Sequence, residues 1–235
     1  NKYFKPGGRP NGERYRSVPM FEYKPIPLAA DLAVVGAFVE VWLAKKHAQG
    51  NGHVGMNLLT KVQEPNIHTL YGAMQADVEL IAMGAGLPVE IPRYMGQMAL
   101  GQPVRMPIAV KGATQEYALE FDPARYGGEH HEVSSPRMLA IITSDILARR
   151  PFSLASVPPD GFIIEEPVAG GHNAPPRRKV LDESGQPVYT EKDYANLEKM
   201  RELGFPFWMA GGYGSRDGLA RAMPIGAQGI QAGSV

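Results

Sequence analysis

Two glycine-containing turns stand near the end of the chain, each directly after a short apolar segment. Ala210-Gly211-Gly212 follows one segment, and Gln231-Ala232-Gly233-Ser234 follows the next. Glycine permits a close backbone approach to a ligand, and such turns leave N–H groups free to donate to an anion. The alternative is that these glycines only permit tight turns and close helix–strand packing. Because two turns of this kind follow consecutive segments, with a serine as a further donor, we predict a phosphate-binding site.

A histidine follows a third glycine pair, in Gly170-Gly171-His172. An imidazole titrates near neutral pH and therefore suits proton transfer, so His172 is the candidate catalytic base. The alternative is a loop histidine that hydrogen-bonds to backbone. The other histidines show no spacing typical of metal ligands, and the chain has no cysteine. We therefore expect no metal site, no disulfide and no cysteine nucleophile.

Glu165 and Glu166 precede this histidine and could form a carboxylate pair for glycoside chemistry. Adjacent residues of a strand point to opposite faces, however, so the two side chains should not share one site. The chain also lacks a GxSxG nucleophile elbow and a phosphate-binding P-loop with its lysine.

Short apolar runs alternate with amphipathic stretches from about residue 32 onward, which predicts strands and helices in alternation. Near-continuous apolar strands are typical of parallel sheets that are covered on both faces. The order favours an α/β fold of the (β/α)₈ TIM-barrel class, in a single domain over 1–235 with a loop region at 1–31. The expected strands are 32–36, 53–59, 78–83, 138–143, 161–165, 205–210 and 229–232, and the expected helices are 38–47, 68–76, 145–150, 192–203 and 216–223.

The first barrel strand has two candidate positions. Residues 20–28 are one, but Pro25 and Pro27 make them a poor central strand. The other is sequence outside these 235 residues, which we favour.

One segment departs from the alternation. Residues 103–110 and 116–121 both alternate apolar and polar residues around Lys111-Gly112-Ala113-Thr114. This pattern predicts a β-hairpin inserted beside the barrel over 103–121. It could serve as a lid or as a contact in a homodimer.

The composition is that of an ordinary globular protein, with 44% hydrophobic and 20% charged residues. Lysine plus arginine and aspartate plus glutamate each number 24. This balance gives no reason to expect nucleic acid or an anionic membrane as a partner. No apolar run is expected to reach the roughly 20 residues that span a bilayer, and no signal peptide is visible. We therefore expect a soluble, cytoplasmic protein.

Three blocks resemble the nitronate monooxygenase family, once called 2-nitropropane dioxygenases. They are Ala169-Gly170-Gly171-His172, then Ala210-Gly211-Gly212-Tyr213-Gly214, then residues 226–234 (GAQGIQAGS), in the family's order and spacing. Val54-Gly55-Met56-Asn57 is similar to an early barrel strand of that family. The resemblance covers residues 32–235, apart from the hairpin.

The resemblance implies a TIM barrel that binds FMN non-covalently and oxidises alkyl nitronates with O₂. Asn57, Glu165, Gly170 and Gly171 would line the flavin, and His172 would remove a proton from the substrate carbon or orient the anionic substrate. The reduced cofactor would then react with oxygen. Gly211, Gly212, Gln231, Ala232, Gly233 and Ser234 would hold the ribityl phosphate.

The sequence departs from the family at several positions. The family usually has glutamine where Glu165 stands and a carboxylate where Ala169 stands, and Pro175-Pro176 with the basic run Arg177–Lys179 is atypical. The alternative function is an FMN-dependent enoyl-thioester reductase that uses NAD(P)H, with the basic run as a docking patch for an acidic carrier protein. A barrel that only binds or assembles, without catalysis, is the third hypothesis.

Overall fold

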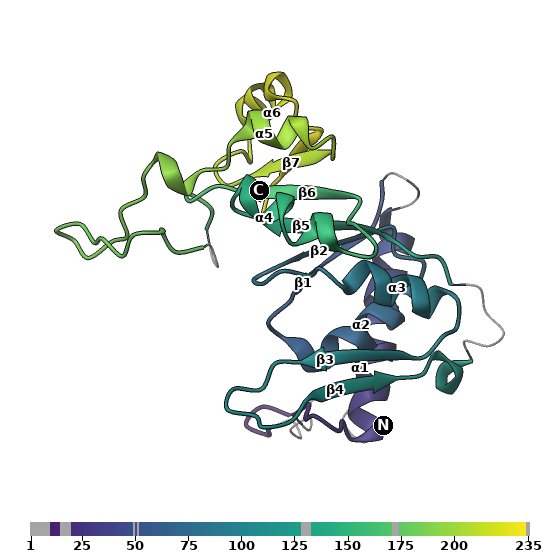
Figure 1. The fold of residues 1–235 in the computed structure, drawn as a ribbon. Helices are drawn as coiled ribbons and strands as arrows, with labels where there is room; N and C mark the ends of the chain where they lie inside the picture. Colours follow the sequence, from purple (N-terminus) through teal and green to yellow (C-terminus); the bar gives the residue numbers. More distant parts are fainter. Residues whose placement is uncertain are drawn as a thin grey trace.

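The structure is a computed structural model and describes residues 10–14, 20–48, 50, 52–127, 133–170 and 174–233. Its centre is a curled sheet of six parallel strands (Figure 1). The strands lie side by side in the order in which they follow along the chain, as expected for successive βα units. They are β1 (Gly55–Leu59), β2 (Leu80–Gly84), β5 (Arg137–Ile142), β6 (Gly161–Glu165), β7 (Phe207–Ala210) and β8 (Gly229–Gln231).

Six α-helices and four short 3₁₀ helices connect and cover these strands in the described ranges. The α-helices are α1 (Pro27–Ala48), α2 (Gln63–Gln75), α3 (Ile91–Ala99), α4 (Asp145–Arg149), α5 (Leu197–Glu202) and α6 (Arg216–Ala222). The 3₁₀ helices are η1 (Pro123–Tyr126), η2 (Phe152–Leu154), η3 (Glu191–Asp193) and η4 (Met223–Ile225).

The sheet is a half-barrel. All neighbouring strands of the six-stranded sheet are parallel. Its two edge strands, β1 and β8, do not pair with each other in the part of the chain that the structure describes. The α/β class and the parallel sheet are confirmed. Closure into eight strands stays a prediction.

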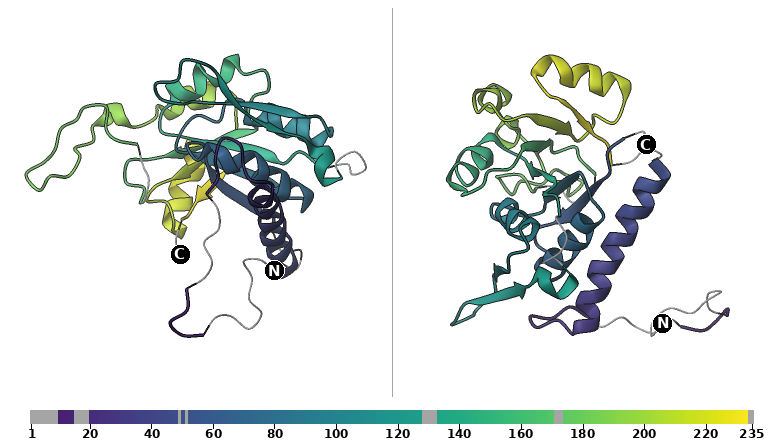
Figure 2. Two further views of the ribbon diagram at one scale, coloured as in Figure 1. Left: turned by 90° about the horizontal axis from the view of Figure 1, so that it is seen from below. Right: turned by 90° about the vertical axis from the view of Figure 1, so that its right-hand side faces the viewer.

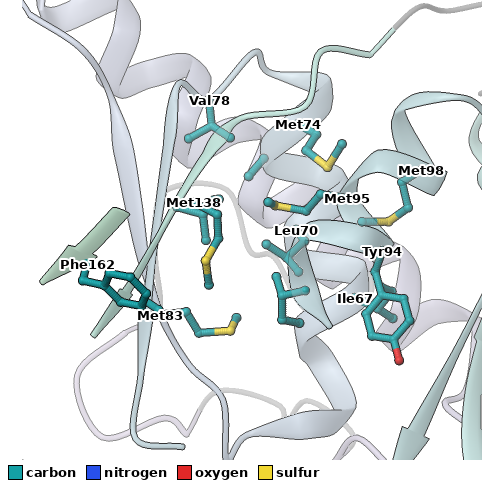
Figure 3. Packing of buried hydrophobic residues seen from close by; sticks show 14 of the residues in the cluster. Ile67, Leu70, Met74, Val78, Met83, Tyr94, Met95, Met98, Met138 and Phe162 are labelled. Carbon is teal, nitrogen blue, oxygen red and sulfur yellow. The ribbon is translucent and has the colours of Figure 1, made fainter. Parts of the chain in front are cut away.

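The two faces of the sheet have different partners. On the convex face, the side chains of Met83, Met138 and Phe162 pack toward α2 and α3, where Leu70 and Met95 lie (Figure 3). On the concave face, Ala82, Leu139 and Ile163 form a smaller cluster with Ala210. The helices therefore leave the concave face and the strand ends for a ligand.

Trp208 fills part of the concave face because the neighbouring strands carry glycine beside it. An added Cβ would lie 3.1 Å from the indole at Gly161 and 3.0 Å from it at Gly229. The register places Gly229 opposite Trp208 on β8 and Ile163 opposite it on β6. The indole thus lies on the inner face, two residues before Ala210 along β7.

The prediction of a strand over 32–36 was wrong, because these residues lie inside α1. An apolar run of five residues has no decisive period, and the flanking residues settle the structure. The buried residues of α1 are Ala29, Ala30, Val34, Ala37 and Val41, which recur at helical spacing and pack on α2. The last five residues of the loop region predicted over 1–31 therefore belong to α1, which begins at Pro27.

The expectation that no apolar stretch approaches bilayer length was also wrong. Helix α1 has 22 residues, and an 18-residue window within it has a mean hydropathy of 1.7, so the helix is long and apolar enough to cross a membrane by length and composition alone. A core helix passes the same criterion, and one side of α1 is buried against α2. Its other side exposes Val35 and Trp42, at 55% and 48%. Figure 2 shows α1 running along the outside of the molecule.

The hairpin prediction is confirmed by β3 (Val104–Ile108) and β4 (Tyr117–Phe121), which pair antiparallel outside the main sheet. The backbone N–H of Ala109 donates to Gln63 Oε1 at 3.0 Å, which ties the hairpin to the start of α2. Its role as a lid or dimer contact stays a prediction.

Two other helix predictions need correction. No helix was predicted over 91–99, where α3 lies; Pro92 stands in its first turn, where proline is tolerated. The helix predicted over 192–203 is split into η3 and α5, since Asn196 caps α5 by accepting from the Lys199 N–H at 3.0 Å. Residues 174–196 form an arm that extends from the sheet (Figure 1).

Acid will destabilise the protein through His68 of α2. This histidine is 5% exposed between the rings of Phe21 and Phe121, and burial, with the nearby Arg125 charge, lowers its pKa to about 4. Below about pH 6.5 the unfolded chain takes up a proton that the folded chain refuses until about pH 4. The contribution of neutral His68 to the free energy of unfolding is therefore fully present above about pH 6.5. It falls by up to about 3 kcal/mol as the pH drops toward 4.

Urea unfolding at pH 7, 5.5 and 4.5 measures this loss. His68→Phe is expected to flatten the pH dependence, because the variant retains an aromatic ring but has no group to protonate. Equal slopes for the wild type and the variant would contradict the assignment to His68.

Candidate active site

A cavity of about 660 Å³ lies at the carboxyl ends of the parallel strands. In α/β barrels this end of the sheet carries the active site. Residues from all six strands or the loops that follow them line it. They are Asn57, Leu59, Gly84, Ala85, Ile141, Glu165, Ala169, Gly170, Ala210, Gly211, Gly212, Gly214, Gln231, Ala232 and Gly233.

The period of two along each strand aims the polar side chains at this cavity. In β1, Met56 and Leu58 pack in the core, so that Asn57 and Leu59 face the concave side. The register aligns Glu165 of β6 with Ala210 of β7, and Ala210 with Gln231 of β8. Three neighbouring strands therefore present their last inner residues at one level.

The two glycine turns border the same cavity because β7 and β8 are neighbours. Gly211 and Gly212 have φ values of +85° and +69°, in the left-handed region that favours glycine. A Cβ on Gly211 would lie 2.9 Å from the Glu166 carbonyl oxygen, so tight packing also requires this glycine. Among the described residues, apart from its chain neighbours, none has an atom within 4 Å of a Cβ added to Gly233. The described residues therefore leave space beside it for a ligand.

A strained residue stands at the end of β2. Ala85 has φ +53°, which costs an L-residue about 1–2 kcal/mol. It lines the cavity between Gly84 and Gly86, both of which pack too closely to accept a side chain. Strain of this kind gathers at ligand sites, where the surrounding structure holds it in place.

The two adjacent glutamates point to different surroundings, as the strand period predicts. Glu165 lines the cavity, and burial raises its pKa above the usual range for glutamate. Glu166 is not among the lining residues of this cavity and accepts a hydrogen bond from the Tyr213 hydroxyl at 3.1 Å. Burial raises the pKa of Glu166 as well, against the opposing effects of Tyr213 and Arg221. Glu165 is thus the one ionisable side chain among the described residues that line the cavity at the carboxyl ends.

The structure brings together eight of the eleven residues singled out in the sequence. Their contact with a cofactor stays a prediction. The eight that line the cavity are Asn57, Glu165, Gly170, Gly211, Gly212, Gln231, Ala232 and Gly233. Gly171, His172 and Ser234 lie outside the described residues. Gly170 lines the cavity at the carboxyl ends, and Ala174 lines a small neighbouring cavity.

The sequence reasoning missed the apolar part of the lining. Leu59 and Ile141 lie inside apolar strands, and only the alternation of inner and outer residues could have marked them. Thr143, Ser144 and Asp145 are polar residues directly after β5, but none of them lines the cavity at the carboxyl ends. Asp145 instead accepts a hydrogen bond from the Asn196 N–H at 3.1 Å.

A larger cavity of about 910 Å³ lies toward the amino-terminal ends of the strands. Its lining includes inner-face side chains such as Ala82, Leu139 and Trp208, with Asp77 and Arg137 at the edge. Side chains fill this part of a closed barrel. We therefore place the functional site at the carboxyl ends.

The cavity at the carboxyl ends fits FMN by size and by donor type. Sites for ligands of this size measure about 300–1,000 Å³. Its described lining has no lysine or arginine. A phosphate would therefore be held by backbone N–H groups of the glycine turns, while the Asn57 and Gln231 amides and the apolar Leu59 and Ile141 suit a polar-edged ring.

No family model and no curated protein matches the sequence. Among solved structures, the chain is similar to FabK from Thermotoga maritima and to a mutant of that FabK, each with 17% identity and a TM-score of 0.48. The alignments cover 86% of this chain, and 52% of the FabK chain or 55% of the mutant chain. The chain spans about half the length of these structures. Similarity this low assigns no family.

Proposed function

We propose that the chain binds FMN at the carboxyl ends of its sheet and is an FMN-dependent oxidoreductase of the nitronate monooxygenase type. The observation that carries the proposal is the single cavity lined by Asn57, Glu165 and both glycine turns. These residues belong to β1, β6, β7 and β8 or to the turns that follow these strands. The likeness of the three glycine-containing blocks to the family supports the same reading.

The residues at the cavity would each have a separate role in binding or in proton transfer. Backbone N–H groups at Gly211, Gly212 and Gly233 would donate to the phosphate, which fixes the ring above Asn57 and Glu165. FMN, when bound, supplies a two-electron acceptor. His172 would take a proton from the substrate carbon, or orient an anionic substrate. Leu59 and Ile141 would exclude water from one side of the ring.

Binding of FMN can be measured through Trp208. The chain has two tryptophans, Trp42 and Trp208, and Trp42 lies on the exposed face of α1. In Trp42→Phe protein the remaining indole lies on the inner face of β7, two residues before Ala210, which lines the cavity, so titration with FMN should quench its emission with a stoichiometry of one. No quenching and no flavin absorbance after gel filtration would reject the cofactor and favour a non-catalytic binding protein.

The second candidate is an FMN-dependent enoyl-thioester reductase that uses NAD(P)H. The observation in its favour is the exposed basic run Arg177–Lys179, on the arm that follows the site loop. Anaerobic mixing distinguishes the two reactions. Bleaching of bound FMN by a nitronate but not by NADPH supports the monooxygenase, and rapid bleaching by NADPH supports the reductase.

A further inference from the structure

The loop after β6 and the turn after β7 are packed directly against each other. The Glu166 N–H donates to the Ala210 carbonyl at 2.9 Å, which continues the pairing of the two strands by one residue. Beyond it, the α-carbon of Gly211 faces the backbone of the β6 loop, with the Glu166 oxygen and the Ala169 nitrogen 2.9 and 3.1 Å from an added Cβ. The shape of the glycine turn therefore depends on this loop.

One side-chain hydrogen bond joins the two segments. The Tyr213 hydroxyl donates to Glu166 Oε1 at 3.1 Å, and Tyr213 is only 9% exposed. Burial raises the pKa of both groups, and for Tyr213 the nearby Glu166 raises it further. A half-buried carboxyl group that loses its donor bears a desolvation penalty. The pair therefore resists separation of the two segments.

Helix α6 holds the same turn from the other side. Arg221 Nη2 donates to the Gly212 carbonyl at 3.2 Å, and the guanidinium lies 5.2 Å from the centre of the Tyr213 ring. At the start of α6, Gly218 leaves room for the Tyr213 carbonyl, which would be 2.2 Å from an added Cβ. The turn has contacts to a neighbouring loop and to a helix, and its remaining side borders the cavity.

We infer that Tyr213, acting through Glu166, is a positioning residue that holds the Gly211–Gly212 turn in the shape that receives a phosphate, so that the pair determines the preference for FMN over riboflavin. The inference rests on the proposed function. Backbone N–H groups bind a phosphate only when the turn directs them at it, whereas the ring contacts come from Asn57 and Glu165 on other strands. Loss of the Tyr213–Glu166 bond should weaken phosphate binding selectively.

The test compares FMN with riboflavin, which lacks the phosphate, by fluorescence titration. The wild type should bind FMN at least tenfold more tightly than riboflavin. In Tyr213→Phe, the Kd for FMN should rise about tenfold, the effect of one hydrogen bond to a charged group, and the Kd for riboflavin should stay within about twofold. A general loss of structure would weaken both ligands alike, so the ratio of the two Kd values is the informative quantity.

Variants of Glu166 separate the hydrogen bond from the volume of the side chain. Glu166→Gln retains an acceptor for the Tyr213 hydroxyl and should retain the wild-type ratio. Glu166→Ala should behave like Tyr213→Phe, and the double variant Tyr213→Phe with Glu166→Ala should be no worse than either single change. Tyr71→Phe is the matched control. It removes the hydroxyl of a buried tyrosine on α2, packed beside Phe121 and away from the cavity, and should leave the ratio unchanged.

An unchanged ratio in folded Tyr213→Phe, or equal weakening of both flavins, overturns the inference while FMN binding by the wild type still supports the proposed function. If Tyr213→Phe does not fold, Glu166→Ala against Glu166→Gln provides the same comparison. A wild type that binds neither flavin overturns the proposed function and this inference with it.

Discussion

Protein in which Gly211 is replaced by alanine will bind FMN about 100-fold more weakly than the wild type. Gly211 has φ +85°, where an L-residue pays about 1–2 kcal/mol. Its new Cβ would also lie 2.9 Å from the Glu166 carbonyl oxygen, a backbone atom that cannot rotate away. Together the strain and the close contact cost about 3 kcal/mol. The turn must either distort or bind the phosphate with less favourable free energy, and a loss of this size corresponds to about 100-fold in Kd. Isothermal titration with FMN measures the loss.

Gly185→Ala provides a control for backbone strain alone. Gly185 lies on the arm with φ +80°, and no described residue other than its chain neighbours has an atom within 4 Å of its added Cβ. This variant should lose about 1 kcal/mol of stability and bind FMN like the wild type. If Gly211→Ala binds FMN as tightly as Gly185→Ala does, the turn after β7 is not the phosphate site.

The sequence was sufficient to predict the parts of the site that depend on backbone chemistry. Glycines directly after apolar segments mark the carboxyl ends of strands, and parallel strands bring those ends to one edge. The resemblance to the nitronate monooxygenase family implied roles for Asn57, Glu165 and Gln231, and Gln231 also belongs to a glycine turn that directly follows an apolar segment. In the structure all three residues line one cavity.

Tertiary contacts determine the parts that the sequence could not reveal. The apolar pattern of residues 32–36 is compatible with a strand or a helix, and packing on α2 stabilises the helix. Ile141 faces the cavity, while Ile142, the next residue, is buried in the core. The Tyr213–Glu166 bond joins residues 47 positions apart, and no local pattern encodes such a pair.

Replacing His172 by alanine should abolish most turnover of a neutral nitroalkane and leave FMN bound. His172 is two residues beyond Gly170, which lines the cavity, and it lies outside the residues that the structure describes. The described lining of the cavity at the carboxyl ends offers Glu165 as its one ionisable group, and burial raises the pKa of that carboxyl. If His172 is the base, its removal lowers kcat by about 10²–10⁴-fold, the usual contribution of general-base catalysis.

Stopped-flow reduction of the bound flavin by a nitroalkane, before and after the substitution, measures this step apart from the reaction with oxygen. His53→Ala is the control, since that side chain is 89% exposed at the opposite end of the sheet and should not affect the rate. A substrate supplied already as its nitronate needs no proton removed. If His172 acts only as a base, His172→Ala should therefore oxidise the nitronate at close to the wild-type rate while losing the neutral nitroalkane. Equal loss with both substrates would assign His172 to orienting the anion, and full activity with both would remove it from the mechanism.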